Sequence, residues 1–379
     1  MATLRIAWHD YNMGEDGFNI YRSDAPMNPN SMPSPIASVG PNVGAYTDST
    51  VIGGNEYYYR VGVTRNGKEV IGEEQKLLAA NFVLASASQD NTIKRIDFYG
   101  NEIWSSSKYE GRFYDVAIDP TGYIYGSSWD NNAIRKFNSS DGNEVTSGGW
   151  PFTGHTQRPY AVTIDASGNI YTGASDNTLK KIDPDGNEIW SFDGHTNNVY
   201  TIAIDSNGYV YSGSNDSTLK KINPDGTEVT SGWPFTGHTN TIIGIAIDSN
   251  DNVYSASYDE TVKKIDPNGN EVWTFDSESN GNNDGHTSYL GDVAVDSNNN
   301  VYSASWDGTV KKIDSNGGHV WTFDRHKSRV VSITIDSNDN IYTASSDKTV
   351  KKLDINGNEI WSFKGHTENV AGVTVHLSY

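Results

Sequence analysis

Apolar and polar residues alternate in short runs along most of the chain. Between residues 199 and 235 the runs read VYTIAID, YVYSGS, STLKKIN and TEVTSGWPF, and the clusters DSNG, ND and PDG separate them. Alternation with a period of two is typical of half-buried β-strands, and Gly, Asn and Asp between such runs favour tight hairpins. The segment is therefore predicted to form four antiparallel strands. The abundance of Gly, Asn, Ser and Tyr extends the all-β expectation to the whole chain.

The run YSASWDGTVKKIDSNGGHVWTF at residues 302–323 has close copies that begin at Tyr171, Tyr254 and Tyr342. When the copies are aligned, an aspartate recurs after each second strand, at spacings of 40 to 48 residues. A period of about 40–45 residues with four strands per unit indicates a β-propeller. We predict that residues 80–379 form a seven-bladed propeller. Its turn aspartates are Asp90, Asp130, Asp176, Asp216, Asp259, Asp307 and Asp347.

The repeat array opens with a second strand, NFVLASAS, and ends with a first strand, VAGVTVHL. We expect Val370–Leu377 to complete the blade formed by residues 82–105. Such closure removes the two free sheet edges that an open array would expose.

The repeats resemble the WD-repeat family over roughly 300 residues. A Gly-His step precedes the first strand at His155, His195, His238, His286 and His366, and His326 stands at the same place after Arg325. The resemblance implies that the His, the turn Asp and a Ser or Thr of the second strand form a buried hydrogen-bonded set. Two features depart from the family. The signature Trp-Asp at the end of the third strand is replaced, and a tryptophan stands on the fourth strand, as in the repeats of pyrroloquinoline-quinone propellers.

Residues 1–79 contain different runs, among them LRIAWHD, GFNIYRSD and NEYYYRVGVTRNG. Their order resembles a fibronectin type III sandwich, which implies that Trp8 is the core tryptophan of the second strand. Only Met1 to Leu4 precede the Trp8 strand, so the first strand of such a sandwich is absent. The residues Leu4, Arg5, Ile6, Ala7 and Trp8 should then form an open edge. Two interpretations are possible: a tolerated short edge, or a docking site for a strand of a partner.

Composition and charge exclude several classes of function. The formal net charge of −20 argues against nucleic acid or an anionic membrane as the main partner. The chain has no cysteine, which rules out a disulfide framework and a thiolate metal site. It has no apolar run long enough to span a membrane, and MATLRIAWHD does not have the character of a signal peptide.

The sequence predicts no catalytic residue, no metal site and no cofactor. The repeated histidines are expected to be structural. The turns at Asp183 and Asp336 carry Asp-x-Asp/Asn steps but lack the distal bidentate Glu of a full calcium loop. The quinone-cofactor enzymes that the repeats resemble use a vicinal disulfide, which a cysteine-free chain cannot form. The double lysines of the third strands recur around the whole array, so they are expected to be part of the scaffold.

Binding is the more plausible function, and its candidate face lies at the turns between the second and third strands. The residue before the turn aspartate varies, and it is aromatic at Trp129, Tyr258 and Trp306. These rings could form platforms for a sugar or a protein, or they could pack between blades. Loop insertions such as DSESNGNNDGHTS add to this face.

These features lead to the hypothesis of a non-enzymatic structural or adhesion component of a tailed-bacteriophage virion. The chain would be made in the host cytoplasm and act in the extracellular particle. The sandwich would attach it to other virion proteins, and the propeller would display a face for a host glycan or protein. The architecture carries this hypothesis by resemblance alone. A bacterial propeller enzyme, carbohydrate-active or quinone-type, and a cytoplasmic interaction scaffold are the alternatives.

Overall fold

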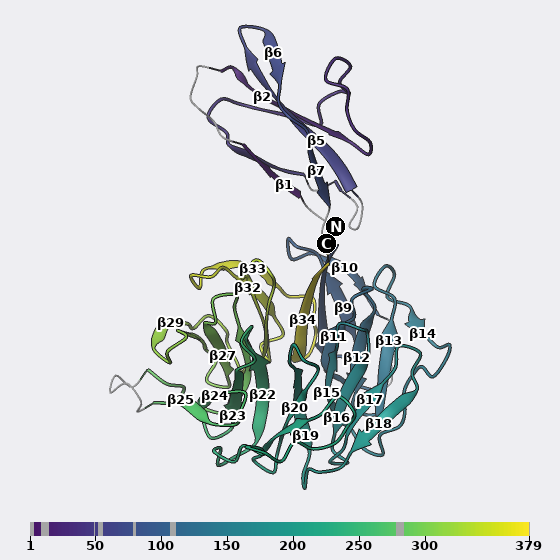
Figure 1. The fold of residues 1–379 in the computed structure, drawn as a ribbon, viewed down its shortest axis with the longest axis vertical. Helices are drawn as coiled ribbons and strands as arrows, with labels where there is room; N and C mark the ends of the chain where they lie inside the picture. Colours follow the sequence, from purple (N-terminus) through teal and green to yellow (C-terminus); the bar gives the residue numbers. More distant parts are fainter. Residues whose placement is uncertain are drawn as a thin grey trace. The chain divides into compact units, whose positions relative to one another are not determined.

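The computed structural model describes residues 4–8, 15–48, 50–51, 56–78, 81–106, 111–277 and 284–378. Every regular element in these residues is a β-strand, which confirms the all-β expectation (Figure 1). The chain forms two compact units, one of Met1–Phe82 with Leu377–Tyr379 and one of Val83–His376. The boundary predicted between residues 79 and 80 falls a few residues before this division.

The first unit contains two sheets that share a hydrophobic core. One sheet pairs β1 (Leu4–Ala7) with β4 (Ala45–Asp48) in antiparallel register. The other has the order β3-β2-β5-β6, with β7 also pairing with β5. Its strands are β2 (Gly17–Ser23), β3 (Ala37–Val39), β5 (Glu56–Arg65), β6 (Lys68–Ile71) and β7 (Gln75–Leu78). Ile6, Ile20 and Tyr59 bring side chains of both sheets into the core, and Trp8 packs against it.

β1 lies at the margin of its sheet, as the sequence predicts. Among the described residues β4 is its single strand partner, so no strand covers the opposite edge of Leu4–Ala7. The prediction placed Trp8 within the strand, and this was wrong by one residue. The strand ends at Ala7, and the Trp8 N–H donates to the Gly44 carbonyl at 3.0 Å. His9, which the sequence also assigned to this edge, lies outside the described residues.

The second unit contains seven sheets within the described residues. Their strand orders are β10-β9-β8-β34, β11-β12-β13-β14, β15-β16-β17-β18, β19-β20-β21, β22-β23-β24-β25, β26-β27-β28-β29 and β30-β31-β32-β33. The strands are β8 (Asn81–Ser88), β9 (Ile93–Ile96), β10 (Glu102–Ser105), β11 (Phe113–Ile118), β12 (Ile124–Ser128), β13 (Ala133–Phe137), β14 (Glu144–Val145), β15 (Pro159–Ile164), β16 (Ile170–Ala174), β17 (Leu179–Ile182), β18 (Glu188–Phe192), β19 (Val199–Ile204), β20 (Val210–Ser214), β21 (Leu219–Ile222), β22 (Ile242–Ile247), β23 (Val253–Ser257), β24 (Val262–Ile265), β25 (Glu271–Phe275), β26 (Leu290–Val295), β27 (Val301–Ser305), β28 (Val310–Ile313), β29 (His319–Phe323), β30 (Val330–Ile335), β31 (Ile341–Ser345), β32 (Val350–Leu353), β33 (Glu359–Phe363) and β34 (Val370–Ser378).

The first strands of successive sheets lie next to one another, from β11 through β15, β19, β22 and β26 to β30. β34 continues this series, because the Val373 N–H donates to Ser332 Oγ of β30 at 3.3 Å. On its other side, a Cβ atom placed on Gly372 would lie 3.1 Å from Asp115 Cα of β11. We call these seven strands the innermost strands. Their succession returns to its starting point.

The C-terminal strand pairs where the sequence predicts. β34 is the hydrogen-bonded neighbour of β8, which confirms its predicted position beside the strands of residues 82–105. The Asn369 carbonyl, just before β34, accepts the Gln89 N–H at 2.9 Å, just after β8. The start of one strand therefore faces the end of the other.

Each sheet donates one tryptophan N–H to a backbone carbonyl of the following sheet. The pairs are Trp104–Ser139, Trp150–Pro184, Trp190–Pro224, Trp233–Pro267, Trp273–Ser315, Trp321–Ile355 and Trp361–Phe98, with Nε1–O distances of 2.8–3.4 Å. Five of these tryptophans lie on the fourth strand of their sheet, and Trp150 and Trp233 make the same contact from outside a strand. Each ring covers the boundary between two sheets while its N–H is satisfied.

One predicted strand is not formed. TEVTSGWPF was expected to be the fourth strand of the sheet containing β19, but the structure has only isolated bridges there, at Glu228 and Phe235. The added residues around Ser231 carry the chain away from the sheet edge, and Pro234 has no N–H to contribute to a ladder.

The double lysines of the third strands behave as scaffold, as expected. Lys180 Nζ lies 2.9 Å from Glu188 of the same sheet, and Lys263 makes the same contact with Glu271 at 3.0 Å. The following lysine points to the next sheet, where Lys221 donates to the Pro267 carbonyl at 3.3 Å.

Candidate functional site

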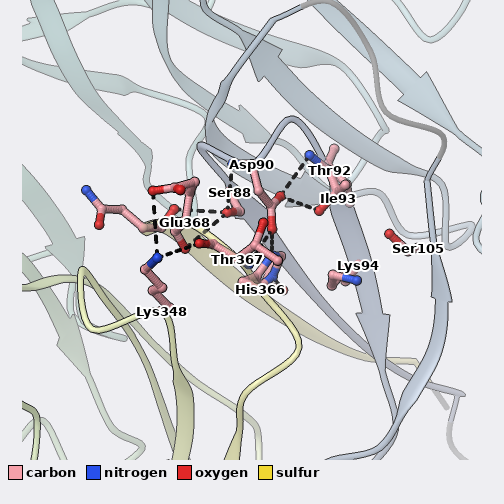
Figure 2. Close-up of polar contacts among 12 residues, drawn as sticks. Ser88, Asp90, Thr92, Ile93, Lys94, Ser105, Lys348, His366, Thr367 and Glu368 are labelled. Carbon is pink, nitrogen blue, oxygen red and sulfur yellow. Dashed lines mark hydrogen bonds and ion pairs between the residues drawn. The ribbon is translucent and has the colours of Figure 1, made fainter.

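Six of the seven turn aspartates belong to the hydrogen-bonded set that the WD-repeat resemblance implies. Asp90 Oδ2 lies 3.0 Å from His366 Nδ1 (Figure 2). His366 Nε2 lies 2.8 Å from Ser86 Oγ. The equivalent Asp–His pairs, with O–N distances of 2.8–3.1 Å, are Asp176–His155, Asp216–His195, Asp259–His238, Asp307–His286 and Asp347–His326. In all but one of these sets the second ring nitrogen bonds to a Ser or Thr of the second strand. The exception is His155, whose Nε2 has no hydrogen-bond partner among the described residues.

The aspartates of these sets are stabilised in their charged form. Burial alone would raise the pKa of Asp90, but hydrogen bonds from His366, Thr92 and the Thr367 N–H outweigh burial and hold the pKa well below its ordinary value. The five equivalent aspartates are shifted in the same direction for the same reasons. The six histidine side chains are at most 1% exposed, so a substrate cannot reach their ring nitrogens. Their arrangement fits a structural role.

Asp130 departs from the pattern because, among the described residues, its carboxylate pairs with Arg112. Arg112 Nη2 and Nε contact the two carboxylate oxygens of Asp130 at 2.9 and 3.1 Å. These bonds from Arg112 lower the pKa of Asp130 to about 2. Both side chains are partly exposed, so the pair contributes little to stability. Its consequence is to place an arginine beside Trp129.

The structure places the three predicted aromatic residues in two groups. Tyr258 and Trp306 pack together with ring centroids 5.1 Å apart, and both contact Tyr289. Trp129 belongs to a second group and packs on Tyr160 at 6.2 Å and on Tyr114 at 5.8 Å. Both groups pair residues of adjacent sheets, as the packing interpretation expects. All three predicted rings are half-buried and keep exposed surface, as the binding interpretation requires.

Arginines lie over the two tryptophans. Trp129 has the guanidinium carbon of Arg112 at 4.4 Å and that of Arg158 at 4.7 Å from its ring centroid. Arg329 lies over Trp306 at 4.1 Å. The sequence analysis missed these arginines. Each stands immediately before the first residue of an innermost strand, and a comparison of the residues at that position in all the repeats would have revealed them.

A cavity of about 470 Å³ runs along the innermost strands. Its lining includes Arg329, which precedes β30, and Ile335, which ends β30, so the cavity follows the whole length of that strand. Tyr258 and Trp306 line it, and so does Tyr114 of the other aromatic group. Its volume is within the range of about 300–1,000 Å³ usual for ligand sites.

Two aspartates face this cavity, and the sequence interpretation overlooked both. Asp115 on β11 and Asp292 on β26 lie deep in the protein, yet each keeps some accessible surface, which the cavity provides. Asp115 accepts the Val162 N–H at 2.9 Å, and Asp292 accepts the Ile333 N–H at 3.0 Å, each from the next innermost strand. One cavity therefore holds two carboxylates that the sequence analysis did not single out.

Burial raises the pKa of Asp115 to about 6 and that of Asp292 to about 7. The charge of Asp115 adds to the shift at Asp292. Carboxyl groups with such values can exchange protons near neutral pH. Their signal in the sequence was an aspartate inside an apolar first strand, as in FYDVAI and LGDVAV.

The calcium candidates are engaged by their own hairpins. The carboxylate of Asp183 accepts the N–H groups of Asp185 and Asn187 and the Asn187 side-chain amide, at 2.8–3.0 Å. Asp336 is used in the same way by Asn338 and Asn340. Within the described residues no group of three or more His, Asp or Glu side chains is arranged to hold a metal ion. In the same residues no helix has the length and apolarity needed to cross a membrane.

Comparison with known proteins defines the class of fold. Residues 186–223 and 229–266 match the model of the WD domain, G-beta repeat, and residues 258–378 match that of the outer membrane protein assembly factor BamB, a quinoprotein-like propeller. The chain thus contains WD40 repeats and a PQQ-like propeller segment.

Solved structures with the same fold include the WD40 β-propeller domain of Doa1 and the computationally designed Ika8 protein. The Doa1 domain superposes with a TM-score of 0.62 at 20% identity, over 72% of this chain and 89% of that domain. Ika8 superposes with a TM-score of 0.59 at 24% identity, over 78% of this chain and 93% of the designed one. No curated protein matches the sequence. The second unit therefore has the β-propeller fold.

Proposed function

We propose that the protein is a non-enzymatic binding module that binds a partner through the aromatic residues at its cavity. The observation that carries this proposal is the group of Tyr258, Tyr289 and Trp306, with Arg329 stacked on it, at the cavity. Trp, Tyr and Arg are the residues that dominate binding energy at protein interfaces. WD40 propellers generally mediate protein–protein interaction.

Within this proposal the second unit is a seven-bladed propeller closed by β34, and the first is a fibronectin type III-like sandwich. The seven sheets, the Trp361–Phe98 contact and the pairing of β34 with β8 support the first assignment. The β1–β4 and β3-β2-β5-β6 sheets support the second.

We further propose that the module belongs to a tailed-bacteriophage virion. The open edge of β1 would accept a strand of another virion protein, and the propeller would bind a host surface glycan or protein. In the part of the chain that the structure describes, β4 is the single strand paired with Leu4–Ala7, and this supports the role of the other edge. Hydrogen exchange on the free protein and on assembled particles tests it. Docking should slow the amides of this strand most, and equal exchange in both states would rule the edge out.

The binding face is tested with variants in an array of bacterial surface glycans and proteins. Trp306→Ala and Tyr258→Ala should weaken the interaction found for the parent at least about tenfold, as for residues at the centre of an interface. Ser175→Ala, at the equivalent position of another sheet, is the matched control. Full binding by both aromatic variants would assign the rings to packing alone.

The proposal also expects no turnover. Asp115 and Asp292 are the groups that a hydrolase in this cavity would use. Hydrolysis of a glycan by the parent that is lost in Asp292→Asn would therefore replace the binding function with an enzymatic one.

A further inference from the structure

Asp115 and Asp292 are exceptional among the residues at their position. The third residue of each innermost strand occupies equivalent places in the seven sheets: Asp115, Ala161, Thr201, Gly244, Asp292, Ser332 and Gly372. The other five are small and uncharged. The fold therefore tolerates a hydrogen atom, a methyl group or a hydroxyl here, and a carboxylate is not required to build the strand.

The hydrogen bonds made by the two aspartates do not require a charge either. Each accepts an N–H of the next innermost strand, at a place where the ladder of its own strand is interrupted. Ser332 does the same for Val373 with a neutral hydroxyl, at 3.3 Å. Accepting this N–H therefore does not explain why two of the seven residues carry a carboxyl group.

Neither carboxylate has a cationic partner among the described residues. Arg329 is the arginine that lines the cavity, but its guanidinium lies on Trp306. It stands four residues before Ile333, whose N–H Asp292 accepts, which is about 13 Å along an extended strand. Buried carboxylates without a counter-charge are costly, and a cation in the cavity would remove that cost.

The remaining lining suits a slender organic cation. Tyr114, Tyr160, Tyr200 and Tyr258 surround the same cavity as the two aspartates. The rings of Tyr160 and Tyr200 are 4.4 Å apart. Aromatic faces attract cations without demanding a fixed geometry. The tyrosine rings and the two deeply placed carboxylates together favour an ammonium group on an alkyl chain. An inorganic ion would need more oxygen ligands.

We propose that this cavity binds an alkylammonium group, with Asp115 and Asp292 as its counter-charges and the tyrosines as its aromatic contacts. The group is carried either by a free diamine or by a lysine side chain of a partner. The lysine case rests on the proposed binding function, whereas the free diamine does not.

Calorimetric titration of the full chain with cadaverine (1,5-diaminopentane) tests the proposal, with 1,5-pentanediol as the uncharged analogue of equal length. Asp115→Ser, Asp292→Ser and the double variant copy the arrangement at Ser332, and Thr201→Ser is the control at the same position. The parent and Thr201→Ser should bind cadaverine at least about tenfold more tightly than the diol, as expected for one charge-assisted contact. The double variant should lose this preference.

A second arm uses Nα-acetyl-lysine methylamide, which presents the same ammonium on a peptide-like backbone. Stronger binding of this compound than of cadaverine assigns the site to a lysine side chain, and the reverse order assigns it to a free diamine. Binding of neither compound by the parent overturns the proposal, as does an unchanged preference in a folded double variant. If that variant does not fold, equal affinity of the parent for cadaverine and the diol is the deciding negative result. Full partner binding by Trp306→Ala together with cadaverine binding by the parent would place the failure in the proposed function of the face, and not in the cavity.

Discussion

Trp361 donates its indole N–H to the carbonyl of Phe98, at 3.0 Å and across 263 residues of sequence. The same contact joins each of the remaining six pairs of successive sheets, so this one differs only in linking the last sheet to the first. His366 and Asp90 repeat the link at 3.0 Å between side chains (Figure 2). The boundary between the two ends of the array is therefore built like the boundaries inside it.

Replacing Trp361 by Phe should lower the free energy of unfolding by about 1–3 kcal/mol, because the Phe98 carbonyl loses its donor and the smaller phenyl ring keeps only part of the packing. Urea denaturation followed by circular dichroism measures the change. Ile360→Ala is the control, since Ile360 is 52% exposed on the same strand and should matter little. Equal stability of Trp361→Phe and the parent would mean that water replaces the indole at no cost.

Deletion of residues 370–379 should abolish cooperative unfolding or cause aggregation. The deletion removes β34, exposes the edge of β8 and removes the innermost strand between β30 and β11. Light scattering and a thermal melt report the two outcomes. A truncated protein as soluble and as cooperative as the parent would contradict the role assigned to β34.

Acid should destabilise the propeller through its Asp–His sets. The pKa of Asp90 is lower in the folded chain than in the unfolded one, so the unfolded state binds more protons in acid. Stability from this group is complete above about pH 5 and is lost as the pH falls below the ordinary carboxyl range. Asp90→Asn should reduce the slope of unfolding free energy against pH, and the reduction should approach one proton as the pH falls below about 4. An unchanged slope would show that Asp90 titrates normally.

Asp292 should act in the opposite direction. Its pKa is raised to about 7 in the folded chain, so the folded state binds more protons between about pH 4 and 7. Its contribution to stability is fully present below about pH 4 and is lost as the pH rises to 7. An upper limit for this loss is about 4 kcal/mol. Asp292→Asn should flatten the stability profile in that window, whereas Thr201→Ser should leave it unchanged.

Glu260→Gly should raise the free energy of unfolding by about 1 kcal/mol. Glu260 follows a turn aspartate with φ of 69°, a left-handed conformation that costs a residue with a side chain about that much. Gly308 occupies the same place in the next sheet with φ of 86°. Thermal denaturation checks the gain, and Gly308→Ala should produce a loss of similar size.

Much of the fold could be predicted because every repeat carries the same strand and turn signals. The alternation of VYSAS gives the second strand, the Asp after it gives the turn, and the half-unit at each end gives the pairing of β34 with β8. The loss of the fourth strand predicted at 227–235 could not be foreseen in this way. Whether an edge strand stays paired depends on the length of the loop that follows it, and here the residues around Ser231 draw it away.

Less of the candidate site than of the fold could be predicted from the sequence. Trp129, Tyr258 and Trp306 stand out because they vary at a fixed repeat position, but the sequence does not show which of them share a group. Asp115 and Asp292 are separated by 177 positions and are read as polar interruptions of apolar strands. Only the arrangement of the innermost strands brings them to one cavity.

The pairing of β34 with β8 also determines how the propeller resists mechanical force. Because Asn369 faces Gln89, the outer ends of the pair are residues 81 and 378, which lie at the same end of the two strands. Tension applied between these ends loads the backbone hydrogen bonds one after another, as in opening a zipper, and not all together. The His366–Asp90 contact stands at the opposite end of the pair and would be loaded last. The rupture force of the propeller should thus be low at first and rise when the tear reaches that histidine.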